Sequence, residues 1–238
     1  IVLSGRFAEE IRVNEVENYT SLPAPDITCK NDTISWRPVA GAVQYQIWKN
    51  GSLYRVQADT LFAAPAGPYA EYSVIAADKK GTGSFSSEPV SVFDAAMVSV
   101  YQAENFARPS AAPYQGYEGK GFVMITRKEN TRLGFSVDIP ADGVYLFDFR
   151  YANGSGPVNT DNKCAIRSLR EAGHELGVFV FPQRGKDEWS NWGYSNAIQL
   201  PMKKGKHLLS LDYSAFNENM NLEVNDAALD LLRVIRLR

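Results

Sequence analysis

Cysteine and histidine are scarce in this sequence, with two of each among 238 residues. Two cysteines cannot supply a zinc site built from repeated Cys-x-x-Cys pairs. Cys29 and Cys164 fall in different predicted domains, so we expect no disulfide between them. His174 and His207 lie in strand-like segments, where a histidine is usually structural or at the surface.

Neither sign of charge dominates, because 25 basic and 27 acidic residues give a formal net charge of -2. Binding to a phosphate backbone needs an electropositive surface, so nucleic acid is not an expected partner. We interpret the short basic runs as solvated faces. They comprise Lys203, Lys204 and Lys206, and Arg233, Arg236 and Arg238.

Long apolar runs are also missing, and no stretch approaches the roughly 20 consecutive apolar residues of a membrane-spanning helix. The chain opens at Ile1 without a charged n-region or an apolar h-region. We therefore expect any targeting segment to have been removed or to lie elsewhere, and the chain to be the C-terminal part of a larger protein.

Recognisable catalytic motifs are absent: there is no G-x-S-x-G elbow, phosphate-binding glycine loop or H-E-x-x-H pair. Asp187 and Glu188 are adjacent, so on a strand their carboxylates would point apart and lack the facing geometry of glycoside hydrolysis. An enzyme is therefore the least favoured class for this chain.

Apolar residues make up 45% of the chain, enough for sizeable cores, and they recur at every second position between Gly, Pro, Asn and Asp. This pattern predicts an all-β protein, and the length suits two β-sandwiches in tandem. Proline-spaced residues 22–25 end a mixed opening segment. We assign residues 1–23 to a linker or upstream domain, 24–94 to a first sandwich and 98–238 to a second.

The first sandwich contains strand-like segments at 33–36, 43–48 and 72–76, and the Asn50-Gly51 dipeptide predicts a tight hairpin turn. Trp36 with Pro38, Gly41-Ala42 before Tyr45, the Lys49-Asn50-Gly51 turn, Glu71-Tyr72-Ser73-Val74 and the loop 81–87 together resemble a fibronectin type III domain. The resemblance implies a spacer with Trp36 and Tyr72 in its core.

In the second sandwich, alternation is strongest at 144–151, where Tyr145, Phe147, Phe149 and Tyr151 share one face. Four aromatic residues on one face predict a core strand. Further strands are expected at 100–105, 122–125, 133–137, 163–169, 175–181, 197–200, 207–213 and 229–237.

This second part resembles the galactose-binding-like jelly roll of carbohydrate-binding module families 6 and 35. The resemblance is carried, in order, by Gln102-Ala103-Glu104-Asn105, Gly116-Tyr117-Glu118-Gly119-Lys120-Gly121-Phe122-Val123, Pro140-Ala141-Asp142-Gly143-Val144-Tyr145, Arg150-Tyr151-Ala152-Asn153, Trp189 to Trp192, Lys204-Gly205-Lys206-His207 and Leu229-Asp230-Leu231-Leu232-Arg233-Val234.

Sugars lay their apolar CH faces on flat aromatic rings while polar groups at the rim take the hydroxyls. The polar loop 186–194 carries Trp189 and Trp192 outside any apolar run, which suits such a site, although either indole could instead cap the sandwich core. The family resemblance implies a sugar site formed by Tyr117, Arg150, Asn153 and Trp189, to which we add Trp192.

Arg150 suits a carboxylated sugar, or else a surface ion pair. Where many family members carry an Asn directly beside the terminal Asp, this chain has Ala227 and Ala228.

The same families hold a structural calcium ion, and the resemblance implies Gln102, Glu104 and Asp230 as its ligands. Gln102 replaces a frequent Glu and so removes one ligand charge, which should weaken the site. The alternative is that the two acids are satisfied by backbone amides or by a nearby cation.

We therefore expect non-catalytic binding of a polysaccharide or oligosaccharide, which would target an upstream glycoside hydrolase or polysaccharide lyase domain. A structural or protein-interaction module that packs on the catalytic domain is the alternative. The resemblance implies a secreted, periplasmic or cell-surface location, and we expect a monomer.

Overall fold

The computed structural model describes residues 2–3, 11–12, 22–67, 69–158 and 160–238. Apart from three short 3-10 helices, these residues form strands, turns and loops, which confirms the predicted all-β class. The chain divides into two compact units, Ile1–Val92 and Phe93–Arg238. Most of the predicted linker 1–23 lies outside the described residues, within which strands β1 (Val2–Leu3) and β2 (Ile11–Arg12) pair with each other.

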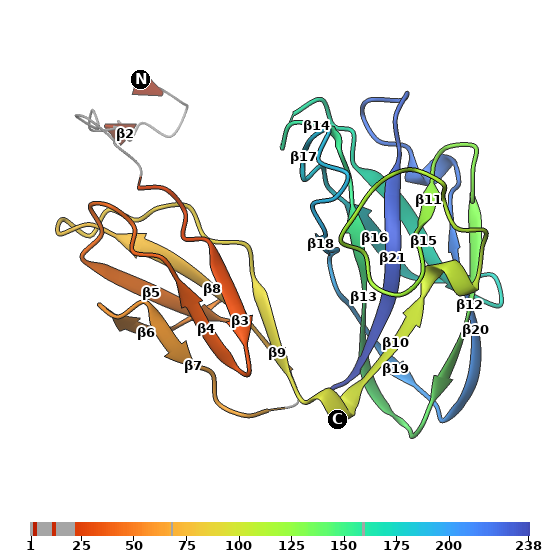
Figure 1. Ribbon diagram of the computed structural model, residues 1–238, viewed down its shortest axis with the longest axis horizontal. Helices are drawn as coiled ribbons and strands as arrows, with labels where there is room; N and C mark the ends of the chain where they lie inside the picture. Colours follow the sequence, from red (N-terminus) through yellow and green to blue (C-terminus); the bar gives the residue numbers. More distant parts are fainter. Residues whose placement is uncertain (1, 4–10, 13–21, 68, 159) are drawn as a thin grey trace. The chain divides into compact units, whose positions relative to one another are not determined.

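Besides the β1–β2 pair, the described part of the first unit contains two larger sheets (Figure 1). One holds β3 (Ile27–Lys30), β4 (Thr33–Trp36) and β7 (Leu61–Ala63), and the other holds β6 (Ser52–Gln57), β5 (Gln44–Lys49), β8 (Tyr69–Ala77) and β9 (Val90–Phe93), in these orders. Trp36 and Tyr72 are buried in the core of this unit, as predicted. The specific resemblance to fibronectin type III stays a prediction.

The predicted turn at Asn50-Gly51 joins β5 to β6 directly, with Lys49 opposite Ser52. Both turn residues have positive φ, 49° at Asn50 and 76° at Gly51. Asn and Gly tolerate this left-handed region best, which is why this dipeptide reverses the chain in two residues.

The second unit is a sandwich of a six-stranded and a four-stranded antiparallel sheet. The first has the order β10 (Val98–Gln102), β21 (Ala227–Arg236), β13 (Gly143–Ala152) and β18 (Gly193–Tyr194), with β11 (Val123–Ile125) also on β21 and β19 (Ile198–Met202) also on β13. The second has the order β12 (Arg132–Ile139), β20 (Gly205–Asp212), β15 (Ala165–Glu171) and β16 (His174–Phe181).

Shorter elements lie in the loops of this unit. They are the paired strands β14 (Ser155–Gly156) and β17 (Gly185–Lys186), and the 3-10 helices η1 (Ala95–Met97), η2 (Ala103–Asn105) and η3 (Ala215–Asn217).

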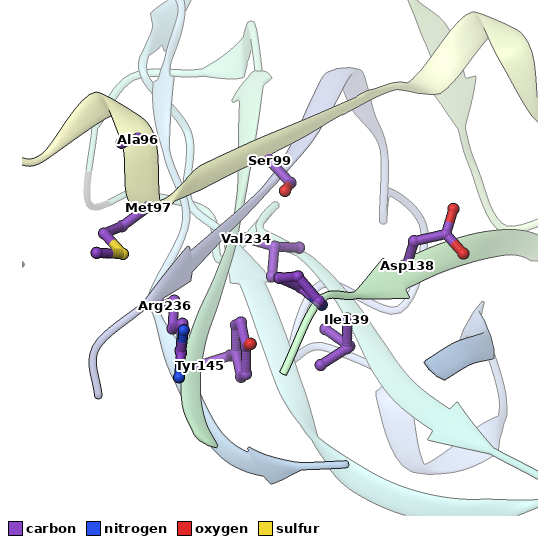
Figure 2. Close-up of a pocket in the computed structure, with 9 residues that line it drawn as sticks. Ala96, Met97, Ser99, Asp138, Ile139, Tyr145, Val234 and Arg236 are labelled. Atoms are coloured by element: carbon purple, nitrogen blue, oxygen red, sulfur yellow. The ribbon is translucent and has the colours of Figure 1, made fainter. Parts of the chain in front are cut away.

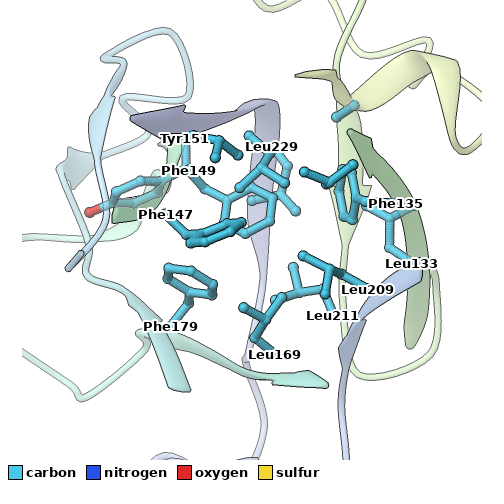
Figure 3. Close-up of a cluster of buried hydrophobic side chains, with 14 of the residues drawn as sticks. Leu133, Phe135, Phe147, Phe149, Tyr151, Leu169, Phe179, Leu209, Leu211 and Leu229 are labelled. Carbon is cyan, nitrogen blue, oxygen red and sulfur yellow. The ribbon is translucent and has the colours of Figure 1, made fainter. Parts of the chain in front are cut away.

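The core of the second unit fills the space between its two sheets (Figure 3). Tyr145, Phe147, Phe149 and Tyr151 all point into it from β13, as their alternation predicted. Phe149 meets Phe179 of the opposite sheet edge to face, with ring centroids 4.9 Å apart. Such edge contacts add to the free energy gained by burying the rings.

β13 is buried on its outer face as well, which the sequence pattern did not indicate. Asp148 lies there directly opposite Arg233 of β21, and both side chains are buried. The guanidinium pairs with the carboxylate through two bonds, Nε to Oδ1 at 2.9 Å and Nη2 to Oδ2 at 2.5 Å. The ring of Tyr194 covers it, with its centroid 3.8 Å from the guanidinium carbon.

The prediction that Arg233 belongs to a solvated basic face is therefore wrong. Its partner lies 85 residues away in the sequence, so the local charge run gave no sign that the cation is neutralised and covered.

Cys29 and Cys164 are both free thiols and lie in different units, as expected. His207 has a structural role, with its ring nitrogens 2.7 Å from a Glu171 carboxylate oxygen and 2.8 Å from the Lys203 carbonyl oxygen. In the described part of the chain, no helix is long and apolar enough to cross a membrane.

The Asp148–Arg233 pair yields a stability test. Asp148→Asn removes the carboxylate charge from this buried pair, and we expect it to lower the free energy of unfolding of the second unit by about 3–5 kcal/mol. Urea denaturation followed by circular dichroism measures this change.

Two further variants make the test specific. Asp138→Asn makes the same chemical change at an exposed position of β12 and should cost less than about 0.5 kcal/mol. The double variant Asp148→Leu with Arg233→Met removes both charges and should recover most of the loss. A loss in the single variant no larger than in the Asp138 control would contradict the structure.

Candidate functional site

Five aromatic side chains gather on the outer face of the six-stranded sheet, where β13 ends and β21 begins. Ala152 and Ala228 stand opposite each other at this point, and their small side chains form the floor. We call the group above them the aromatic cluster. It consists of Tyr114, Tyr117, Phe122, Trp189 and Trp192.

The rings of the aromatic cluster support one another. Tyr114 lies nearly parallel to Trp189, with centroids 5.5 Å apart and planes inclined by 8°, and it also stacks on Phe122 at 5.6 Å. Trp192 meets the rings of Tyr117 and Phe122 edge to face. Phe122 is buried, whereas the other four side chains are half-buried and keep part of their surface open to solvent.

Two loops carry these rings, and hydrogen bonds fasten one loop to the other. The Trp192 Nε1–H donates to the Gln115 carbonyl oxygen at 2.6 Å, and the Gln115 amide donates to the Ser190 hydroxyl at 2.9 Å. Trp192 is thus fixed by its ring nitrogen as well as by its ring contacts.

Trp189 lies directly against Gly154, just beyond the end of β13. A Cβ atom added at Gly154 would come within 2.5 Å of the indole Cδ1. The glycine is therefore required for the close approach of the indole, and it sets the position of the ring that stacks on Tyr114.

Arg150 lies beside the cluster, with its guanidinium carbon 5.5 Å from the Trp192 ring centroid. It pairs with the carboxylate of Asp230 and donates to the Gly116 carbonyl oxygen at 3.0 Å. Of the two roles expected for Arg150, the structure shows the ion pair, and its partner is buried. The charge that would attract a carboxylated sugar is therefore compensated within the protein.

Asp230, the acidic partner of Arg150 in this ion pair, is completely buried. Burial raises the pKa of its carboxyl group, while the backbone amide of Glu118, 3.1 Å from both carboxylate oxygens, and the Arg150 guanidinium act to lower it. The hydrogen bond from the Glu118 amide to Asp230 ties the loop after Tyr117 to β21. Asp230 therefore positions the loop that carries the Tyr117 ring.

The structure brings four of the five predicted sugar-site residues together, namely Tyr117, Arg150, Trp189 and Trp192. Asn153 is placed differently, because its side chain is fully buried. Its amide donates to the carbonyl oxygens of Lys163 and Phe181, at 3.1 and 2.9 Å, and its oxygen accepts from the Ser155 amide at 3.0 Å.

As placed here, Asn153 cannot meet a ligand, and its bonds hold the chain that leaves β13. All of its bonding groups are used by backbone atoms, which the sequence could not show. Two cluster members were not predicted as site residues, namely Phe122, which was expected only as the start of a strand, and Tyr114. The available signal was a second tyrosine in the turn-rich stretch that also holds Tyr117.

The three predicted calcium ligands separate into a pair and a single residue. Gln102 and Glu104 both approach Gly119, since a Cβ there would lie 2.8 and 2.6 Å from their Oε1 atoms. Gln102 Oε1 and Glu104 Oε2 are buried without a hydrogen-bond partner. Such orphaned oxygens suit a cation.

Asp230 fits this ligand set poorly, because its carboxylate is engaged by Arg150 and the Glu118 amide. Across the described ranges, no group of three or more His, Cys, Asp or Glu side chains is arranged to hold a metal ion.

A small pocket lies at the other end of the six-stranded sheet (Figure 2). Met97, Tyr145 and Arg236 gather there, and its volume is about 90 Å³. This is well below the roughly 300–1,000 Å³ of typical ligand sites. The pocket contains none of the predicted sugar-site residues.

No family model matches the chain. Two curated proteins, both cycloisomaltooligosaccharide glucanotransferases from Niallia circulans, are 28% and 26% identical to it over 120 residues. The matched segment covers 49% of this chain and 12% of each relative, so the chain spans only a small part of those enzymes.

Solved structures give matches of similar extent. A Paenibacillus sp. cycloisomaltooligosaccharide glucanotransferase complexed with cycloisomaltoheptaose is 27% identical with a TM-score of 0.42, over 58% of this chain and 18% of that one. A family 35 carbohydrate-binding module from Clostridium thermocellum is 20% identical with a TM-score of 0.43, over 58% and 96%. Family 35 modules, which the sequence motifs resemble, are therefore among the chain's structural neighbours.

The contact between Gly154 and Trp189 can be tested directly. Gly154→Ala should push the indole away from Tyr114, because the new methyl group would overlap it. We expect a change in tryptophan fluorescence and in the near-ultraviolet circular dichroism, with far-ultraviolet signal retained.

Gly134→Ala is the matched control, since a Cβ at this β12 position meets only the Leu209 carbonyl oxygen at 4.0 Å. Unchanged aromatic spectra in the Gly154 variant would show that Trp189 does not occupy the position described.

Proposed function

We propose that the second unit binds neutral oligosaccharides without catalysis, using the half-exposed rings of the aromatic cluster as its platform. The observation that carries this proposal is the pairing of Trp189 with Tyr114 beside the polar groups of two loops. Flat rings with polar groups at their rim are the surface that receives the CH face of a sugar.

The neutral character of the ligand follows from Arg150. Its partner Asp230 is fully buried, so the ion pair leaves little net charge for a uronic acid to meet. The name of the Niallia circulans relatives includes a neutral ligand class, the isomaltooligosaccharides, which we take as the first to test.

We further propose that this chain is the accessory part of a secreted, periplasmic or cell-surface carbohydrate-active enzyme. It would hold an upstream glycoside hydrolase or polysaccharide lyase domain against its substrate and act as a monomer. The match to a short segment of much longer glucanotransferases supports an accessory role.

One observation favours a second candidate, a module that packs on the catalytic domain. The cluster rings already stack on one another, and Ala228 offers no polar group at their floor. On this alternative the cluster would stabilise two loops and bind no sugar.

Titration calorimetry distinguishes the two candidates. We expect the wild-type chain to bind isomaltooligosaccharides more tightly than glucuronic acid-containing disaccharides of similar size. Trp189→Ala should weaken binding at least about tenfold, because losing a buried ring contact removes roughly 1.5 kcal/mol or more.

Trp48→Ala removes a half-buried tryptophan from the first unit and should leave sugar affinity unchanged. The binding proposal fails if the wild-type chain gives no heat with any oligosaccharide of a broad panel. It also fails if the Trp189 and Trp48 variants bind equally well.

We also propose that Gln102 and Glu104 hold a structural calcium ion. A bound ion would supply positive charge to the orphaned Gln102 Oε1 and Glu104 Oε2 atoms. These residues would keep the end of β10 close to the loop at Gly119, and Asp230 would contribute through its bond to the Glu118 amide.

Thermal unfolding with calcium and with a chelator tests this site. At about 100 times its Kd, calcium should stabilise the folded chain by about 2.7 kcal/mol. Gln102→Glu should strengthen the effect by adding a ligand charge, and Glu104→Gln should weaken it. Glu129→Gln, an exposed change elsewhere, is the control. An unfolding temperature that calcium does not move would exclude the site.

A further inference from the structure

An open cavity of about 670 Å³ lies at the loop end of the second sandwich, apart from the aromatic cluster. Its volume is within the range of ligand sites. The loop after β11 and the loop between β20 and β21 form its walls. The lining residues are Thr126, Arg127, Lys128, Tyr213, Glu223 and Asp226.

Tyr213 gives this cavity a fixed aromatic wall. Its ring covers the fully buried guanidinium of Arg167, whose carbon lies 4.7 Å from the ring centroid. Its hydroxyl donates to Glu218 at 2.7 Å and accepts from Arg127 Nε at 3.0 Å. A ring held at its face and at its hydroxyl loses little further freedom when a ligand binds.

Arg167 also ties the two walls together from below. Its Nη2 donates to the Thr126 carbonyl oxygen at 3.0 Å and to the Asn225 carbonyl oxygen at 3.1 Å. Burial lowers the pKa of Arg167 to about 10, so it stays charged at neutral pH and keeps these bonds. Arg127 adds a second tie by donating to the Leu222 carbonyl oxygen. The cavity is therefore preformed.

The lining is polar but balanced in charge. Its charged residues are Arg127 and Lys128 together with Glu223 and Asp226, which gives two cations and two carboxylates. Such a lining offers donors and acceptors to hydroxyl groups without attracting a ligand of either sign. A neutral polyhydroxylated molecule fits this chemistry.

The cavity lies just beyond the ends of two strands that also border the aromatic cluster. β11 and β21 pair with Met124 opposite Ala228, and both residues contact the cluster. Thr126 lies two positions after Met124 and Asp226 lies two positions before Ala228, which in this antiparallel pair is the same direction, and both residues line the cavity. At about 3.3 Å per residue, the step from the Met124–Ala228 row to Thr126 and Asp226 is about 7 Å.

We infer that the cavity is a second subsite of the same sugar-binding surface. The ligand would then be a chain of several neutral sugars that runs from the aromatic cluster past the ends of β11 and β21 to Tyr213. This inference rests on the proposed sugar binding and specifies the length of the ligand.

Calorimetry with isomaltooligosaccharides from the disaccharide to the hexasaccharide tests it. The wild-type affinity should rise with length. Lys128→Ala combined with Glu223→Ala removes two exposed lining side chains, and should lower the affinity for the hexasaccharide about tenfold while leaving the disaccharide unaffected. Asp226→Asn, which keeps the side-chain shape, should act in the same direction.

Trp189→Ala should instead weaken binding of every length, which separates the two subsites. The control is the same pair of charge removals on the four-stranded sheet, Lys206→Ala with Asp138→Ala, both exposed and opposite each other.

The inference is overturned if affinity does not depend on length, or if the cavity variants bind the hexasaccharide as the control does. Loss of binding in Trp189→Ala together with intact cavity variants would leave the proposed function standing and remove this inference alone. No binding by the wild type would remove both.

Discussion

The second unit depends on the pairing of β13 with β21, whose outer face is charged and yet covered. Two ion pairs of opposite polarity lie on it: Asp148 of β13 with Arg233 of β21, and Arg150 of β13 with Asp230 of β21. Buried charges are tolerated only where their partners and hydrogen bonds are complete. Other parts of the chain cover this face: the ring of Tyr194 lies over the first pair, and the loop after Tyr117 donates its Glu118 amide to the second.

The same arrangement bears on the proposed recognition of neutral sugars. Because Arg150 is neutralised by Asp230, the polar side of the site supplies hydrogen bonds more than net charge. The rings of Tyr114 and Trp189 stack on each other and are held by their loops, so a ligand would meet a surface that is already ordered. Preorganisation of this kind favours affinity because little freedom is left to lose on binding.

Local patterns in the sequence predicted much of the fold. Alternation placed Phe147 and Phe149 in the core, and the Asn50-Gly51 dipeptide gave the hairpin turn, because both depend on neighbouring residues. Burial of Arg233 and Asn153 could not be predicted in this way. The partner of Arg233 lies 85 positions away, and Asn153 is bonded to backbone groups that only the folded chain brings near it.

Ala227 and Ala228, the first residues of β21, affect which interactions the candidate site and the cavity can each offer a ligand. The families that this part of the chain resembles often carry an Asn at this point, whereas here Ala228 faces Ala152 and leaves an apolar floor under the rings. An apolar floor can support stacking but cannot orient hydroxyl groups. Further polar side chains follow beyond the strand ends, among them Thr126 and Asp226. A ligand that stacks on the rings and also reaches these polar groups must extend past the start of β21, which is the physical reason to propose a chain of sugars over a single one.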